Sequence, residues 1–238
     1  MSTRTQLVFT WCAPIGVVVI LVGFWAIAGY LPPPPASSTA DQIAAFYRDR
    51  PGPIRLGLVL TFAGCAAWGP LVAVITHRML EIRPRNLTLV CGQLAAGIAA
   101  WGFLLVPLIV LAVAAFRPQR SAEATQTLHD LGWMLLIMPF VPFTVQNTCL
   151  GWAILQDMGS PPALPRWVGY FNLWVALSFI PGGVIALFKT GPLAYDGVFA
   201  FWIPFTVFFV WLLVMPFALH RAIVANRSRP DESITVLN

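Results

Sequence analysis

Charged side chains are scarce in this sequence, and they lie almost entirely between long apolar runs. Only 10% of the 238 residues are Asp, Glu, Lys or Arg, whereas 58% are hydrophobic. A soluble globular domain carries about 25% charged residues, so the composition excludes an ordinary soluble fold. The chain has room for five or six membrane spans of about 20 residues with short loops, so we expect a single integral membrane domain over residues 1–238.

Acidic residues are fewer than basic ones, and the formal net charge is +5. The basic residues lie between the apolar runs, where they are typical of membrane loops. No basic patch alternates with aromatic residues on a polar surface, so we expect no nucleic-acid partner. The partners that the sequence predicts are the lipid bilayer, other membrane subunits or a second copy of the chain, and a small apolar ligand.

Cysteine and histidine are also few, and neither forms a recognisable motif. The four cysteines lie in apolar segments without C-x-x-C spacing, which is typical of small buried hydrophobes. Two histidines share a predicted face with three cysteines, a conceivable metal or haem set that lacks the short local spacing of such sites: His77, His220, Cys12, Cys91 and Cys149. We therefore predict no metal, no cofactor and no catalytic residue.

Six runs without charged side chains are each long enough to cross a hydrocarbon core of about 30 Å. Because unpaired backbone groups are costly in lipid, each run must be helical. The sequence thus predicts an all-α, polytopic membrane helix bundle with six transmembrane helices. A cleaved signal peptide is the alternative for the first run, but that run is longer than a typical signal peptide. The six spans are expected at residues 7–31, 56–76, 86–116, 131–156, 167–188 and 197–219.

The arginine and lysine distribution favours both termini on the cytoplasmic side of a plasma (inner) membrane. Residues 32–55 then form an outer loop and residues 220–238 a cytoplasmic tail. The inner segments hold Arg4, Arg78, Arg83, Arg85, Arg166, Arg221, Arg227 and Arg229, and the outer ones hold Arg48, Arg50, Arg55, Arg117, Arg120 and Lys189.

A short amphipathic helix is expected in the outer loop. Thr39 and Gln42 have the spacing of a capping box, which marks a helix start. Ile43, Phe46 and Tyr47 follow at helical spacing and share one face. We expect this helix to lie on the outer surface or to fold over the mouth of the bundle.

Each predicted span contains proline, so kinked helices are expected throughout. Proline is also common in membrane helices generally, so kinks alone do not indicate a site. Pro181, followed by Gly182 and Gly183, is the strongest candidate for an actual helix break. Broken helices often build the midplane sites of transporters.

No ionisable residue is predicted at the centre of a span, which argues against proton pumps and porters of charged substrates. The candidate ligand-binding residues are instead uncharged polar side chains predicted in the cytoplasmic half of the bilayer. Because a buried amide needs a hydrogen-bond partner, they should face one another, either joining helices or lining an inward-opening pocket. This set consists of Thr10, Thr76, Gln93, Gln146, Asn147 and Asn172.

Three hypotheses for function follow. The first is a non-catalytic accessory or partner subunit of a membrane complex, because aromatic and apolar surface is abundant and no catalytic constellation is present. The alternative is a facilitator or binding protein for a small neutral or lipid-like molecule. The third is a membrane enzyme with a metal or haem site.

Overall fold

A computed structural model describes residues 2–227, which form helices and connecting loops with no strand among them. The predicted all-α membrane bundle is confirmed, and the chain is a multi-pass membrane protein whose surface contacts the lipid bilayer. In this described part of the chain, six helical stretches are long and apolar enough to span a membrane: Thr3–Ile27, Pro51–Met79, Leu87–Phe116, Ala122–Leu155, Arg166–Leu187 and Val198–Ala225.

The spans are built from α-helices interrupted by short π-helical and 3-10 segments, labelled η. The elements in chain order are α1 (Thr3–Leu21), η1 (Val22–Ile27), α2 (Ala40–Asp49), α3 (Pro51–Gly64), η2 (Cys65–Ala67), α4 (Trp68–Met79), α5 (Leu87–Phe116), α6 (Ala122–Ile137), α7 (Phe140–Leu155), α8 (Arg166–Ser178), η3 (Ile180–Leu187), η4 (Val198–Trp202) and α9 (Ile203–Arg227).

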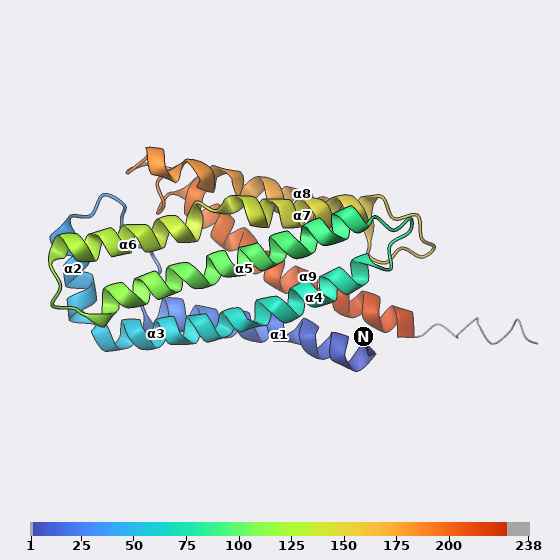
Figure 1. The fold of residues 1–238 in the computed structure, drawn as a ribbon, viewed down its shortest axis with the longest axis horizontal. Helices are drawn as coiled ribbons and strands as arrows, with labels where there is room; N and C mark the ends of the chain where they lie inside the picture. Colours follow the sequence, from blue (N-terminus) through green and yellow to red (C-terminus); the bar gives the residue numbers. More distant parts are fainter. Residues whose placement is uncertain (1, 228–238) are drawn as a thin grey trace, which may run out of the picture.

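Both ends of the described chain lie at the same end of the elongated bundle (Figure 1). We call this the terminal end, and it also carries the loops 80–86 and 156–165. The opposite end, which we call the distal end, carries α2 and the loop 117–121. The helix α9 extends into the predicted tail as far as Arg227, whereas Arg229 lies outside the described residues. Which end faces the cytoplasm stays a prediction.

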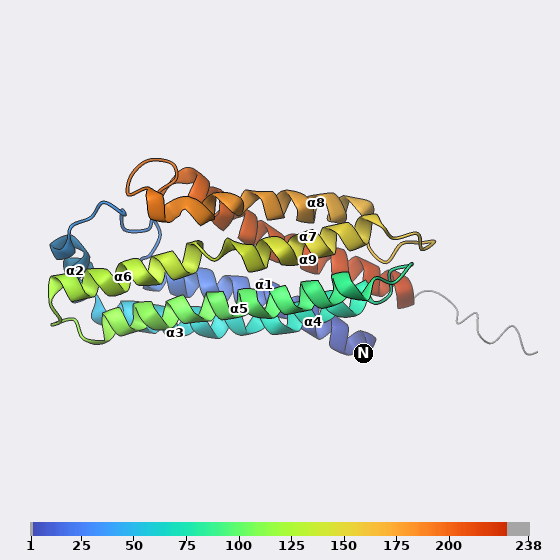
Figure 2. The ribbon, with the colours of Figure 1, turned by 45° about the horizontal axis from the view of Figure 1, so that its top comes forward.

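The short helix α2 lies across the distal end, beside the first turns of α6 (Figure 2). The predicted capping box is present: the Thr39 backbone N–H donates to Gln42 Oε1 at 2.9 Å, and the Gln42 N–H donates to Thr39 Oγ1 at 3.4 Å. Ile43 and Tyr47 are buried against the bundle, as the amphipathic pattern predicts. The helix therefore covers the distal mouth.

The fourth helix begins earlier than the charge pattern indicates. Ser121 caps α6, because its Oγ accepts from the Ala124 N–H at 3.3 Å. His129 and Asp130 therefore lie within α6 and not in the loop before it. This first part of α6 already packs against the bundle, since both Thr125 and His129 are buried.

Helical hydrogen bonding is interrupted at five places within the spans. Two of these segments are the π-helices η1 and η4, and a third is the 3-10 turn η2. The fourth lies at Met138 and Pro139, between α6 and α7. The fifth confirms the predicted break: α8 ends at Ser178, and the chain around Pro181 continues as the 3-10 helix η3.

Candidate functional site

A cavity of about 170 Å³ lies within the bundle, with α1, α3, α5, α7 and α9 contributing to its wall. Its lining is rich in phenylalanine, including Phe103, Phe140, Phe205 and Phe208. The few polar groups of the wall already have partners: Thr61 Oγ1 donates to the Gly57 carbonyl at 2.7 Å, and Trp68 Nε1 donates to the Gly97 carbonyl at 2.8 Å. The cavity therefore presents an apolar surface to anything that enters it.

Small residues also line the cavity and leave space beside the phenylalanines. Ala13, Gly16, Gly64 and Ala100 all line the cavity and contribute little volume. A Cβ atom added to Gly16 would lie 2.6 Å from Ala67 Cβ and 2.7 Å from the Gly64 carbonyl oxygen. The close approach of α1 to the second span thus requires glycine here, and it fixes one wall of the cavity.

All five helix interruptions contribute residues to this same cavity. Phe24 comes from η1, Cys65 from η2, Gly182 from η3 and Phe201 from η4, while Pro139 marks the break between α6 and α7. Backbone that leaves regular helical bonding at membrane depth is tolerated only where protein or a cavity surrounds it. Short π-helical turns also occur frequently at functional sites. The convergence of these interruptions makes this cavity the candidate functional site.

A layer of aromatic rings forms the floor of the cavity on its terminal side. Trp68 and Phe143 line the cavity, and both rings contact Trp211, with centroid separations of 5.5 and 5.4 Å. Trp211 Nε1 donates to Asn172 Oδ1 at 2.9 Å, and Asn147 Nδ2 donates to the Phe143 carbonyl at 2.8 Å. The predicted amide residues therefore support this floor from below and do not line the cavity.

The structure brings part of the predicted polar set together. Thr76 Oγ1 donates to Gln93 Oε1 at 2.9 Å, which joins the second and third spans. Gln146 lies beside α5, where its Cδ is 3.4 Å from the position of a Cβ on Gly97. Thr10 stands apart, because its hydroxyl donates to the Gln6 carbonyl of its own helix at 2.7 Å.

Several atoms of this layer are buried without a hydrogen-bond partner. They are Gln93 Nε2, both amide atoms of Gln146, and Asn147 Oδ1. All three side chains are fully buried, so these atoms are removed from solvent. Buried polar atoms are rarely left unpaired in proteins, and such atoms can be satisfied by a bound water molecule or by a small polar group. Joining helices and binding a ligand both remain interpretations of this layer.

A second polar network, which the sequence pattern did not reveal, closes the distal side. Tyr30 donates to the Tyr47 hydroxyl at 3.1 Å, and Tyr47 Oη lies 3.0 Å from His129 Nδ1. Tyr195 Oη lies 3.5 Å from His129 Nε2, so a neutral imidazole with its proton on Nε2 satisfies all three contacts. Burial raises the pKa of the hydroxyls of Tyr30, Tyr47 and Tyr195 above the ordinary value of 10.0.

This network forms a cap over the cavity. The Trp133 ring stacks on Tyr195 with centroids 5.6 Å apart and contacts the cavity-lining rings of Phe24 and Phe201. The cap therefore links α2 and α6 to the wall of the cavity. The signal that could have revealed it is the spacing of Thr125, His129 and Trp133, which places all three on one face of a helix.

The conceivable metal or haem set is not assembled. His77 lies 3.8 Å from Glu81, whereas His220 Nδ1 accepts from Trp11 Nε1 at 3.3 Å. Within residues 2–227, no three side chains of His, Cys, Asp or Glu lie close enough together to hold a metal ion. The described part of the chain therefore brings together no set of three donors for the metal site of the third hypothesis.

The chain matches no protein-family model, no curated protein and no solved structure.

Proposed function

We propose that this membrane protein binds a small neutral, apolar molecule in the central cavity, as a binding protein or facilitator for that molecule. The observation that carries the proposal is the meeting of all five helix interruptions at one apolar cavity. Binding sites of transporters are commonly built where membrane helices are discontinuous. The tyrosine–histidine cap lies on one side of this site, and the aromatic floor lies on the other.

The size and chemistry of the cavity define the ligand class. A cavity of about 170 Å³ is close to the roughly 150 Å³ of an apolar cavity that accepts benzene or xenon. Because Thr61 and Trp68 have internal hydrogen-bond partners, the wall offers a polar ligand little compensation for desolvation. The site therefore suits a small ring compound or one segment of a longer hydrocarbon chain, and it disfavours a charged molecule.

The test fills the cavity with a larger side chain and compares the benzene response of that variant with the response of a matched variant at an exposed position. Ala100 lines the cavity and is buried, whereas its neighbour Ala99 is exposed on the same helix. We expect benzene to raise the midpoint of detergent-induced unfolding for the wild-type protein and for Ala99→Leu, but not for Ala100→Leu. An equal benzene response in the two variants would show that benzene acts outside the cavity, and it would refute the proposal.

A direct measurement covers the case in which Ala100→Leu does not fold. Crystals of the wild-type protein under xenon pressure should show xenon beside Ala100 and Phe208, both of which line the cavity. Xenon found only on the lipid-facing surface would equally refute the proposal.

The accessory-subunit hypothesis has no specific support from the described residues. Exposed aromatic residues such as Trp11, Trp152 and Trp167 are abundant, but a lipid-facing surface requires apolar side chains in any case. The placement in a plasma (inner) membrane with both termini in the cytoplasm likewise stays a proposal, based on the distribution of arginine.

A further inference from the structure

A separate, polar cleft lies at the terminal end of the bundle. Its volume is about 820 Å³, and it lies among the end of α4 with the loop after it, the loop 156–165 and the last turns of α9. Four arginines line it, together with two acidic residues: Arg78, Arg83, Arg85, Arg221, Glu81 and Asp157. The cleft is therefore rich in guanidinium groups and is distinct from the apolar cavity.

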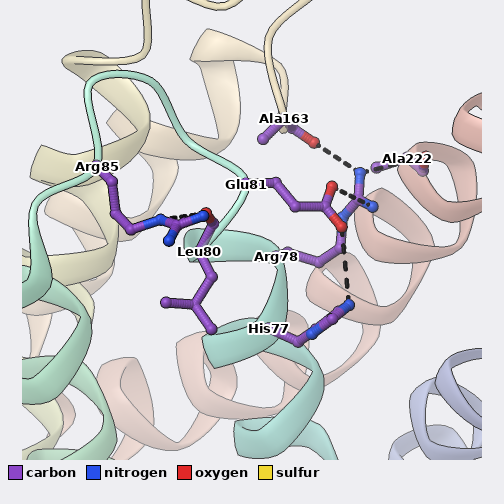
Figure 3. Close-up of polar contacts among 7 residues, drawn as sticks. All are labelled: His77, Arg78, Leu80, Glu81, Arg85, Ala163 and Ala222. Atoms are coloured by element: carbon purple, nitrogen blue, oxygen red, sulfur yellow. Dashed lines mark hydrogen bonds and ion pairs between the residues drawn. The ribbon is translucent and has the colours of Figure 1, made fainter. Parts of the chain in front are cut away.

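Arg78 forms the base of this cleft. Its side chain is only 4% exposed, and its Nη1 lies 2.7 Å from Glu81 Oε2. Its Nη2 donates to the carbonyl oxygens of Ala163 and Ala222, each at 3.3 Å, and so joins α4 to the neighbouring loop and to α9 (Figure 3). The Nε atom of Arg78 is buried and has no hydrogen-bond partner. The cleft thus holds a buried cation with one unused donor.

The two carboxylates of the cleft are already engaged. Asp157 Oδ1 accepts from the backbone N–H groups of Arg83 and Gly159 at 3.1 and 2.9 Å, and Oδ2 accepts from that of Ala163 at 2.7 Å. Glu81 pairs with Arg78 and also lies 3.8 Å from His77. Both carboxylates therefore stabilise the local fold and leave the remaining arginines unneutralised.

Three arginines of the cleft have no carboxylate partner among residues 2–227. Arg85 donates from Nε to the Leu80 carbonyl at 2.9 Å (Figure 3), and Arg221 lies over the Phe217 ring at 4.9 Å. Arg83 is exposed at the same rim. Guanidinium groups bind phosphate through paired, charge-assisted hydrogen bonds, so this arrangement fits a phosphate group better than a cation or a neutral ligand.

We propose that this cleft binds the phosphate headgroup of an anionic membrane lipid. A lipid is favoured over free phosphate because Trp167 and Phe217 line the same cleft and are 48% and 53% exposed. These rings offer an apolar surface to an acyl chain next to the arginines that hold the phosphate. Basic pockets between transmembrane helices bind anionic headgroups in the same way. The proposal rests on the cleft alone and is independent of the ligand of the central cavity.

The test measures lipid retention on the purified full-length protein by native mass spectrometry. We expect the protein to retain phosphatidylglycerol in preference to phosphatidylcholine. Arg83→Gln and Arg221→Gln should each lower the retained phosphatidylglycerol roughly five-fold. Both side chains are exposed, so the variants should fold. The matched control is Arg117→Gln, which removes an exposed arginine at the distal end and should leave retention unchanged.

Three outcomes would overturn the proposal. One is equal retention of the two lipids, and another is an equal loss in the Arg117→Gln control. The third outcome concerns the source of the phosphate. We expect inorganic phosphate, added to the protein in phosphatidylcholine, not to stabilise the protein against unfolding. If inorganic phosphate stabilises the wild-type protein as strongly as phosphatidylglycerol does, and Arg83→Gln removes that effect, then the cleft binds free phosphate and not a lipid.

Discussion

At the scale of single residues, Gln146 and Asn172 show two opposite uses of a buried amide. Both side chains are fully buried. Asn172 Oδ1 accepts from Trp211 Nε1 at 2.9 Å, and Asn172 Nδ2 donates to the Val168 carbonyl at 2.7 Å. Both amide atoms of Gln146 lack a partner. The hydrogen bonds of Asn172 therefore stabilise the bundle. The Gln146 amide loses its hydrogen bonds to water on burial and gains none in return, so it destabilises the folded protein.

This difference predicts opposite effects of substitution by leucine. Asn172→Leu should lower the free energy of unfolding by about 1–3 kcal/mol, because Trp211 Nε1 loses its acceptor. Gln146→Leu should leave that free energy unchanged or raise it, since no hydrogen bond is lost. The free energy of unfolding is measured by titrating each purified variant with a denaturing detergent. An equal loss in both variants would mean that Gln146 has a bound partner, and would favour the ligand-binding interpretation of the amide layer.

At the scale of elements, the helix α2 is held to α6 by hydroxyl groups that must stay protonated. Tyr47 is fully buried and contacts Tyr30 and His129 through its hydroxyl. Burial raises the pKa of Tyr47 above its ordinary value of 10.0. The unfolded chain therefore releases this proton at a lower pH than the folded protein does. By linkage, the fold loses stability as the pH rises above about 10.

The prediction is that α2 is the alkali-sensitive element of the bundle. The free energy of unfolding of the wild-type protein should fall between pH 9 and pH 11, and that of Tyr47→Phe should fall less, because the titrating hydroxyl is absent. While both proteins are folded, their tyrosinate absorbance should not differ over this range, because the buried Tyr47 hydroxyl keeps its proton until the protein unfolds. Parallel curves for the two proteins would show that Tyr47 does not control the alkaline transition.

Helix starts and breaks could be predicted from the sequence, because they depend on interactions between residues that are close in the sequence. The capping box of Thr39 and Gln42 and the break at Pro181 depend only on neighbouring residues, and both appear in the structure. The charge pattern predicts a fourth span that begins at residue 131 and so leaves His129 outside it, because an ionisable side chain is costly in lipid. The burial of His129 depends on Tyr47 of α2, which lies far away in the sequence and reaches it only in the folded chain.

The candidate site was less predictable for a related reason. The burial of Gln93 and Asn172 follows from the cost of an exposed amide in lipid, so their inward orientation could be predicted. The cavity depends instead on which small residues meet which large ones, for example Gly16 against Ala67. Such pairings require the register between helices, which the apolar pattern of a single span does not determine.

At the scale of the whole molecule, the bundle is asymmetric along its long axis. The terminal end carries the arginine-rich cleft, and the distal end is covered by α2 and the tyrosine–histidine cap. The predicted inner segments hold eight of the fourteen basic residues and the predicted outer ones hold six, so we expect the terminal end, with its arginine-rich cleft, in the cytoplasm. The proposed lipid site would then face the inner leaflet.

Labelling of introduced cysteines tests this orientation in intact cells. In a variant without the four native cysteines, Ser37→Cys lies in the distal loop before α2 and Ser160→Cys lies in the terminal loop before α8; both positions are exposed. A membrane-impermeant maleimide should label position 37 in intact cells and position 160 only after the membrane is permeabilised. The reverse pattern would place the arginine cleft on the outer face. Labelling of both positions in intact cells would contradict the six-span topology itself, since these loops lie at opposite ends of the bundle (Figure 1).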